Sequence, residues 1–137
     1  MSRRLADFAG AWRIARRIDD RRTGTMADLA GTATFSRDHA GLIHDEAGVL
    51  RLPGAAPLTA TRRYLWRPAP GGIAVHFATG VPFHTFDPVA RQPGARHDCA
   101  PDLYVVRYDF TGWPDWRVTW TVSGPRKDYN STTAYRR

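Results

Sequence analysis

The densest group of reactive side chains in the sequence comprises His97, Cys99, Asp102 and Tyr104. Together with His84 they supply nitrogen, sulfur and oxygen atoms, the ligand types that zinc binds in proteins. Metal sites usually contain paired cysteines or histidines, whereas Cys99 is the sole cysteine of the chain. We therefore predict no metal site here and expect a hydrogen-bonded polar cluster that lines a pocket.

A second candidate group combines a carboxylate with a guanidinium. In an extended strand every second residue lies on the same face, so Glu46 shares a face with His44, and Arg62 shares one with Tyr64. Two charges inside a protein are tolerated only when they are paired and hydrogen-bonded. We expect Glu46 and Arg62 to point inward as such a pair; an outward pair would contribute only about 0–1 kcal/mol.

Lys127 is the only lysine among 20 basic side chains and lies in the segment Gly124-Pro125-Arg126-Lys127-Asp128-Tyr129. If its ammonium is desolvated, a Lys127–Tyr129 pair would be suited to proton transfer. The alternative is a turn lysine that caps nearby carbonyls or pairs with Asp128.

Two further kinds of chemistry have weaker support. Cys99 would act as a nucleophile if His97 or His84 served as its base. A haem would need His76, His84 or His97 as its axial ligand, and no C-x-x-C-H attachment motif is present. We therefore predict no cofactor.

Alternation of apolar and polar residues dominates the chain and indicates strands. Short connections rich in Gly, Pro and Asp favour antiparallel hairpins. About ten strands would leave two unpaired edges unless the sheet closes on itself. Leu5 and Phe8, with Ser2 as N-cap, predict a short helix that plugs one end. We predict a single all-β domain over residues 1–137, a roughly ten-stranded antiparallel up-and-down barrel with a short N-terminal helix. The expected strands lie near residues 12–18, 29–35, 42–51, 59–67, 73–77, 82–87, 95–99, 103–110, 116–122 and 130–136.

The opening segment Phe8-Ala9-Gly10-Ala11-Trp12 resembles the F-x-G-x-W start of the lipocalin-like, or calycin, superfamily of barrels. This resemblance implies that Trp12 packs across the closed end and that a basic residue near the end of the last strand, here Arg136, covers it. Further segments resemble an uncharacterised bacterial family of small barrels in that superfamily, a resemblance that implies the fold but no activity. They are Arg62-Arg63-Tyr64-Leu65-Trp66, Pro82-Phe83-His84-Thr85-Phe86, His97-Asp98-Cys99-Ala100-Pro101-Asp102-Leu103-Tyr104 and Gly124-Pro125-x-Lys127-Asp128-Tyr129.

The composition narrows the classes of partner. The 137 residues carry a formal net charge of +7, but the arginines are spread from Arg3 to Arg137 and no nucleic-acid-binding motif is present. We therefore expect no nucleic-acid partner; a basic interaction surface would require the arginines to gather on one face. No apolar run approaches the roughly 18 residues of a membrane helix, and no apolar stretch follows the N-terminal charges. We expect a cytoplasmic protein without a membrane partner, and leave open a homodimer.

The most favoured function is the binding of a small organic molecule, anionic or polar-aromatic, inside one barrel mouth. The alternative is a cofactor-independent enzyme of isomerase, decarboxylase or hydrolase type that uses the same pocket. The candidates for a polar, partly basic pocket lining are Glu46, Arg62, Tyr64, His84, His97, Asp102, Tyr104 and Lys127.

Overall fold

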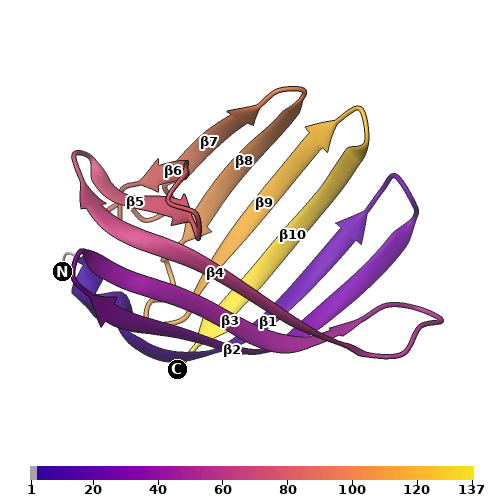
Figure 1. The fold of residues 1–137 in the computed structure, drawn as a ribbon, viewed down its shortest axis with the longest axis horizontal. Coiled ribbons are helices and arrows are strands. Elements are labelled where there is room, and N and C mark those ends of the chain that lie inside the picture. The colour runs from indigo at the N-terminus through magenta and orange to yellow at the C-terminus, as the bar shows by residue number, and fades with distance from the viewer. Residues whose placement is uncertain (1–2) are drawn as a thin grey trace.

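A computed structural model describes residues 3–137 and contains ten antiparallel strands in one sheet (Figure 1). A single 3-10 turn, η1 (Leu5–Phe8), precedes them. The expected all-β, ten-stranded antiparallel barrel with a short N-terminal helical segment is confirmed. The strands are β1 (Gly10–Asp20), β2 (Thr25–Asp38), β3 (Gly41–Arg51), β4 (Leu58–Ala69), β5 (Gly72–Phe77), β6 (Pro82–Phe86), β7 (Gly94–Cys99), β8 (Asp102–Asp109), β9 (Trp116–Gly124) and β10 (Lys127–Arg136).

The strand order β6-β5-β4-β3-β2-β1-β10-β9-β8-β7 shows how the sheet curls into a barrel. The first strand pairs with the last, with Ile14 opposite Tyr135. The two edge strands, β6 and β7, are not hydrogen-bonded to each other, so the barrel is nearly closed.

Side chains bridge the gap between the two edge strands. Phe83 of β6 meets the ring of His97 of β7 edge-on, with 5.2 Å between centroids. The ring of Phe86 stacks on that of Tyr108 of β8 at 4.0 Å. The seam is therefore filled with aromatic rings where backbone hydrogen bonds are missing.

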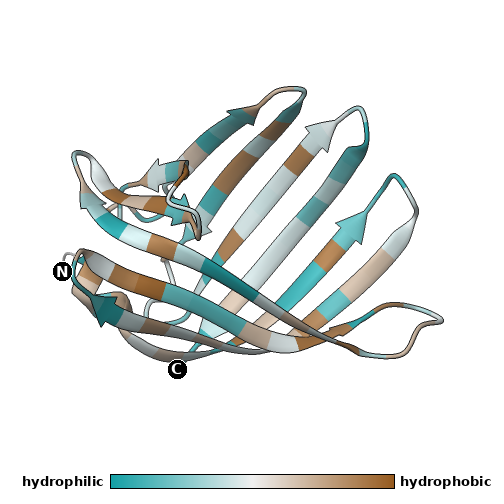
Figure 2. Ribbon diagram, in the orientation of Figure 1, coloured by the Kyte–Doolittle hydropathy of each residue, from teal (hydrophilic) through white to brown (hydrophobic). Residues whose placement is uncertain are grey.

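The strands alternate in hydropathy along their length, as Figure 2 shows. Trp12 and Ile14 of β1 are buried, and Arg13 between them is exposed. On β9, Trp116, Val118 and Val122 are buried in the same way. This period of two arises because successive side chains of a strand point to opposite faces, and it fixes which residues enter the barrel.

The turn η1 closes one end of the barrel, as predicted. Phe8 is fully buried, and its ring packs against those of Trp66, Trp113 and Trp116 at 5.1–5.4 Å. The predicted N-cap Ser2 lies outside the described residues. The barrel is thus filled by aromatic side chains at the η1 end, and any cavity must lie toward the other end.

The basic residue over Trp12 is Arg137, so the assignment of this role to Arg136 is wrong. The Cζ atom of Arg137 lies 3.9 Å from the Trp12 ring centroid, and its Nη2 donates to the carbonyl of Asp7 at 2.7 Å. Tyr135 points inward, so strand alternation turns Arg136 outward. The chain leaves the sheet after β10, which frees the next side chain to fold back over the barrel end.

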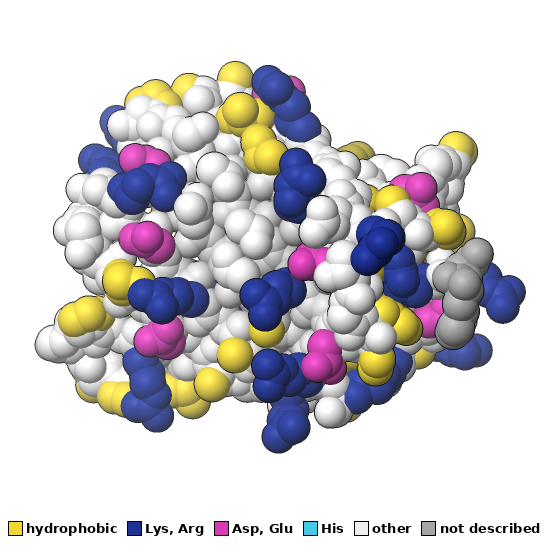
Figure 3. All heavy atoms as spheres, turned by 180° about the vertical axis from the view of Figure 1, so that it is seen from behind, with side chains coloured by type: hydrophobic (Ala, Val, Ile, Leu, Met, Phe, Trp, Pro, Cys, Tyr) yellow, Lys and Arg dark blue, Asp and Glu magenta, His cyan; other side chains and the backbone are white. Residues whose placement is uncertain are grey.

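The outer surface carries many arginines without one continuous basic patch in the view of Figure 3, where acidic side chains stand between them. Several arginines are paired on the surface, for example Arg63 with Asp45 at 2.6 Å and Arg67 with Asp38 at 2.7 Å. Among residues 3–137 there is no helix long and apolar enough to cross a membrane.

Candidate functional site: the barrel cavity

The interior contains a cavity with two adjacent parts, an inner and an outer chamber. The inner chamber, of about 30 Å³, lies among His44, Tyr64, His84, Tyr108 and Tyr135. The outer chamber, of about 280 Å³, extends to residues at the strand ends remote from η1. Five residues line both chambers, so the chambers adjoin each other: Arg16, Glu46, Arg62, Trp120 and Ser131.

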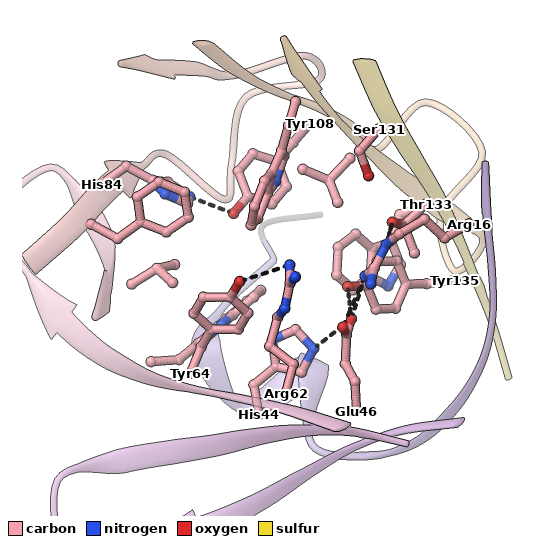
Figure 4. A pocket seen from close by; sticks show the side chains of 16 residues that line it. Arg16, His44, Glu46, Arg62, Tyr64, His84, Tyr108, Ser131, Thr133 and Tyr135 are labelled. Carbon is pink, nitrogen blue, oxygen red and sulfur yellow. Dashed lines mark hydrogen bonds and ion pairs between the residues drawn. The ribbon is translucent and has the colours of Figure 1, made fainter. Parts of the chain in front are cut away.

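Glu46 of β3 is the centre of a buried polar network (Figure 4). Its side chain is only 4% exposed. Arg16 of β1 donates from Nη2 to both carboxylate oxygens, at 2.9 and 2.7 Å, and from Nε to Thr133 Oγ1 at 2.7 Å. Tyr135 of β10 donates to Glu46 Oε2 at 3.1 Å, and His44 Nε2 lies 3.4 Å from the same oxygen. Three side chains from three strands thus converge on one carboxylate.

This network keeps Glu46 ionised. Burial is the largest influence and acts to raise the pKa of Glu46, but His44 and Arg16 together outweigh it, and the pKa lies below its usual range. Burial, followed by the negative charge of Glu46, raises the pKa of Tyr135 well above its ordinary value. The charges of Arg16 and Glu46 therefore cancel inside the barrel, and Tyr135 remains protonated.

The expectation of an inward ion pair is correct in kind, but Arg62 as the partner of Glu46 is wrong. The two residues lie directly opposite each other on β3 and β4. The Arg62 guanidinium instead donates to Tyr64 Oη at 3.2 Å and lies 5.7 Å from the Trp120 ring centroid. Arg16 lies on β1, which is separated from β3 only by β2, and its Nη2 donates to both carboxylate oxygens.

Arg62 is left without an acidic partner. Within residues 3–137, none of the ion pairs involves this guanidinium. In Figure 4 its side chain extends into the cavity beside Tyr64. The neighbouring Arg63 faces the outside, where Asp45 neutralises it. Arg62 therefore contributes an uncompensated positive charge to the wall shared by both chambers.

His84 and Tyr108 form a short hydrogen bond across the seam of the barrel, with 2.7 Å between Nε2 and Oη. Burial, assisted by nearby His97, lowers the pKa of His84 to about 3. Burial, and secondarily Tyr64, raises the pKa of Tyr108 well above its ordinary value. Both side chains are therefore neutral near pH 7, and the pair contributes polarity to the inner chamber without charge.

The eight predicted site residues fall into two groups. Glu46, Arg62, Tyr64 and His84 line the cavity. The other four lie outside its lining, toward the open ends of β7, β8 and β10: His97, Asp102, Tyr104 and Lys127.

Lys127 contacts two other members of the second group, Tyr104 and Asp102. Its Nζ donates to Tyr104 Oη at 3.0 Å and lies 3.1 Å from Asp102 Oδ2. Tyr104, followed by Asp102, raises the pKa of Lys127, so the lysine is held as a cation. The prediction that it pairs with Asp128 is wrong: strand alternation turns Asp128 to the other face, where Arg21 binds it at 2.6 Å.

The possible metal-ligand cluster does not assemble. No group of three or more His, Cys, Asp or Glu side chains placed to hold a metal ion occurs in the described part of the chain. Cys99 is exposed, and His97 packs edge-on against Tyr104 with 5.8 Å between ring centroids.

The sequence analysis missed several residues of the cavity, above all Arg16, Tyr108 and Tyr135. Arg16 continues the inward series of Trp12 and Ile14 on β1. A charged residue in register with an apolar face is a signal that could have found it. The same period of two places Ser131 and Thr133 inside with Tyr135. Serine and threonine in a strand do not by themselves indicate a cavity lining.

Comparison with known proteins agrees with this architecture. No curated protein is significantly similar in sequence. Among solved structures, the barrel is similar to the S-type phycobiliprotein lyase CPES from Guillardia theta, with a TM-score of 0.59 and 8% sequence identity. The match covers 97% of this chain and 89% of the lyase. At that identity the likeness establishes the lipocalin-like fold and nothing more. Residues 8–137 match the model of a family of unknown function, DUF6314, and the chain therefore belongs to that family.

Proposed function

We propose that this protein binds a small organic anion in the barrel cavity and that Arg62 holds the anionic group. The observation that carries the proposal is the free guanidinium of Arg62 beside an open cavity of about 280 Å³. A guanidinium presents a planar fork of N–H donors that matches a carboxylate. Within residues 3–137 this guanidinium makes one hydrogen bond, to Tyr64, which leaves its other donors for a ligand.

Aromatic rings beside this charge favour a planar ligand. Phe83 packs against Trp120 with 5.1 Å between centroids and lies nearly parallel to Tyr64 at 6.1 Å. These rings line the inner chamber next to Arg62, and Trp120 also lines the outer chamber, which is large enough for a ligand ring. Small-molecule sites typically combine such apolar walls with a few convergent polar groups. A monocarboxylic acid with one aromatic ring fits this combination of size, charge and shape.

At 8% identity the name of the lyase supports only a ligand-binding use of the fold. The proposed ligand class therefore rests on the cavity itself. The single-domain organisation over residues 1–137, a bacterial source, a cytoplasmic location and a homodimer remain predictions of the sequence.

Titration calorimetry with a panel of substituted benzoates tests the proposal. We expect binding that weakens about tenfold or more in Arg62→Met, because a hydrogen bond to a charged group contributes about 1.5–3 kcal/mol. Arg63→Met is the matched control, since it removes an arginine from the same strand but from the outer face. The absence of binding across the panel, or equal affinities of Arg62→Met and wild type, would refute the proposal.

The enzyme alternative remains a prediction without assigned residues. Its proposed proton carrier, Lys127, does not line the cavity that contains His44 and His84. No second function is proposed.

A further inference from the structure

The inner chamber is surrounded by buried nitrogen atoms that no protein group satisfies. In the described part of the chain, every buried side-chain nitrogen without a hydrogen-bond partner belongs to a residue that lines this chamber. These atoms are Nδ1 of His44, Nδ1 of His84, Nε1 of Trp66 and Nε1 of Trp116. The other ring nitrogen of His44, Nε2, faces Glu46 Oε2 at 3.4 Å.

The two indoles are the most informative of these groups, because an indole N–H can only donate. Trp66 and Trp116 are each 2% exposed, and a buried donor without an acceptor is costly. Trp12 provides the contrast within the same core: its Nε1 donates to the carbonyl of Phe8 at 2.9 Å. The unsatisfied donors are thus confined to the chamber and are not a general property of the aromatic core.

The Glu46 carboxylate, which is the charged acceptor of the chamber, is already engaged. Both oxygens of Glu46 accept from Arg16, and one also accepts from Tyr135. The volume of about 30 Å³ holds only about two atoms of water size, since one such atom needs roughly 10–15 Å³ on this measure. The chamber therefore fits the tip of a ligand and not a whole one.

The tip must also be uncharged. Arg16 is neutralised by Glu46, and the lowered pKa leaves His84 neutral. A buried anion at this depth would lie close to the ionised Glu46, which would disfavour it. The free positive charge of the cavity lies instead on Arg62, in the wall that borders the outer chamber.

We propose that the inner chamber is an acceptor subsite, which takes an uncharged hydrogen-bond acceptor at the far end of the ligand. The ligand class is a planar monocarboxylic acid that carries a carbonyl or similar neutral acceptor opposite its carboxylate. This inference rests on the proposed function, in which Arg62 holds the carboxylate.

A pair of ligands of equal shape provides the test. 4-Cyanobenzoate ends in a nitrile nitrogen, an acceptor, and 4-ethynylbenzoate replaces that nitrogen with a C–H group of nearly the same size. In calorimetry we expect wild-type protein to bind the nitrile about tenfold more tightly, which corresponds to one hydrogen bond to a buried donor. Terephthalate, with a second carboxylate at the tip, is expected to bind more weakly than either.

Indole replacement locates the subsite. Trp66→Phe and Trp116→Phe each keep an aromatic ring but remove the N–H. We expect at least one of them to bring the ratio of the affinities for 4-cyanobenzoate and 4-ethynylbenzoate close to one. Affinity for 4-ethynylbenzoate should change little. Trp113→Phe is the control, because Trp113 packs against Phe8 and Trp12 outside the cavity lining.

The outcomes separate the two proposals. If both ligands bind equally and still depend on Arg62, the acceptor subsite is wrong and the anion-binding function stands. If neither ligand binds, both are wrong. A preference that survives in both indole variants also overturns the subsite. Should one variant fail to fold, the comparison of the two ligands on wild-type protein and the other variant still show whether the acceptor subsite exists.

Discussion

Replacement of Glu46 by glutamine should destabilise the protein severely, because it leaves the charge of Arg16 buried without a counter-ion. The Arg16 side chain is 11% exposed and that of Glu46 is 4% exposed, so water cannot replace the lost carboxylate. Breaking a buried ion pair by removing one partner typically costs about 3–5 kcal/mol. For a domain of this size we expect the midpoint of thermal unfolding to fall by on the order of 10 °C.

Urea denaturation monitored by tryptophan fluorescence measures this loss of unfolding free energy. Asp45→Asn is the matched control: it neutralises the adjacent carboxylate, which faces outward and pairs with the exposed Arg63, and we expect only a small change. The double variant Arg16→Met/Glu46→Gln removes both charges, and it should recover much of the stability lost in the single variant.

The dependence of the free energy of unfolding on pH provides a second test of this reasoning. The folded-state pKa of Glu46 lies below its unfolded value, so the unfolded chain takes up a proton first as the pH falls. The contribution of Glu46 is therefore complete above its unfolded pKa, near 4.5, and is lost as the pH falls toward its folded pKa. Glu46→Gln should flatten this acid limb of the stability profile.

Two results would refute this reasoning. Glu46→Gln could prove as stable as Asp45→Asn, which would mean that the buried network contributes no net stability. Alternatively, the double variant could be no more stable than Glu46→Gln, which would mean that the uncompensated charge of Arg16 is not the cause of the loss.

Two further variants test the closed end and the second polar cluster. Arg137→Ala should lower the free energy of unfolding by about 1 kcal/mol through loss of the cation–π contact with Trp12, whereas Arg136→Ala, on the outer face, should leave urea denaturation unchanged. Lys127→Met should lower the free energy of unfolding by at most about 1 kcal/mol, because the contact between Lys127 and Asp102 is half-exposed and screened by solvent. Calorimetry should show unaltered affinity for benzoates. A clear loss of affinity would place Lys127 in the binding site.

Much of the barrel follows from local pattern. Trp12 and Ile14 enter the core because strand residues alternate, and the same rule brings Glu46 and Tyr64 inside from the next strands. Short hairpin turns impose antiparallel neighbours in chain order, and the pairing of β1 with β10 follows from the need to cover strand edges. Each of these steps depends only on neighbouring residues and on one general rule of sheets.

The partners of the inward side chains were decided by tertiary structure. Arg62 lies directly opposite Glu46, yet Arg16 binds that carboxylate from β1, on the other side of β2. Lys127 joins Asp102 rather than Asp128 for a related reason: its sequence neighbour faces away, and a residue on β8 faces toward it.

Sequence by itself thus determined the fold class, the face of each strand and half of the cavity-lining candidates. Only the nearly closed barrel decided which arginine is neutralised, which one is free for a ligand, and which buried indole donors are left without an acceptor. The physical reason is that alternation is a local property of the backbone, whereas ion pairing and hydrogen-bond satisfaction depend on distances across the interior, which the twist and closure of the whole sheet set.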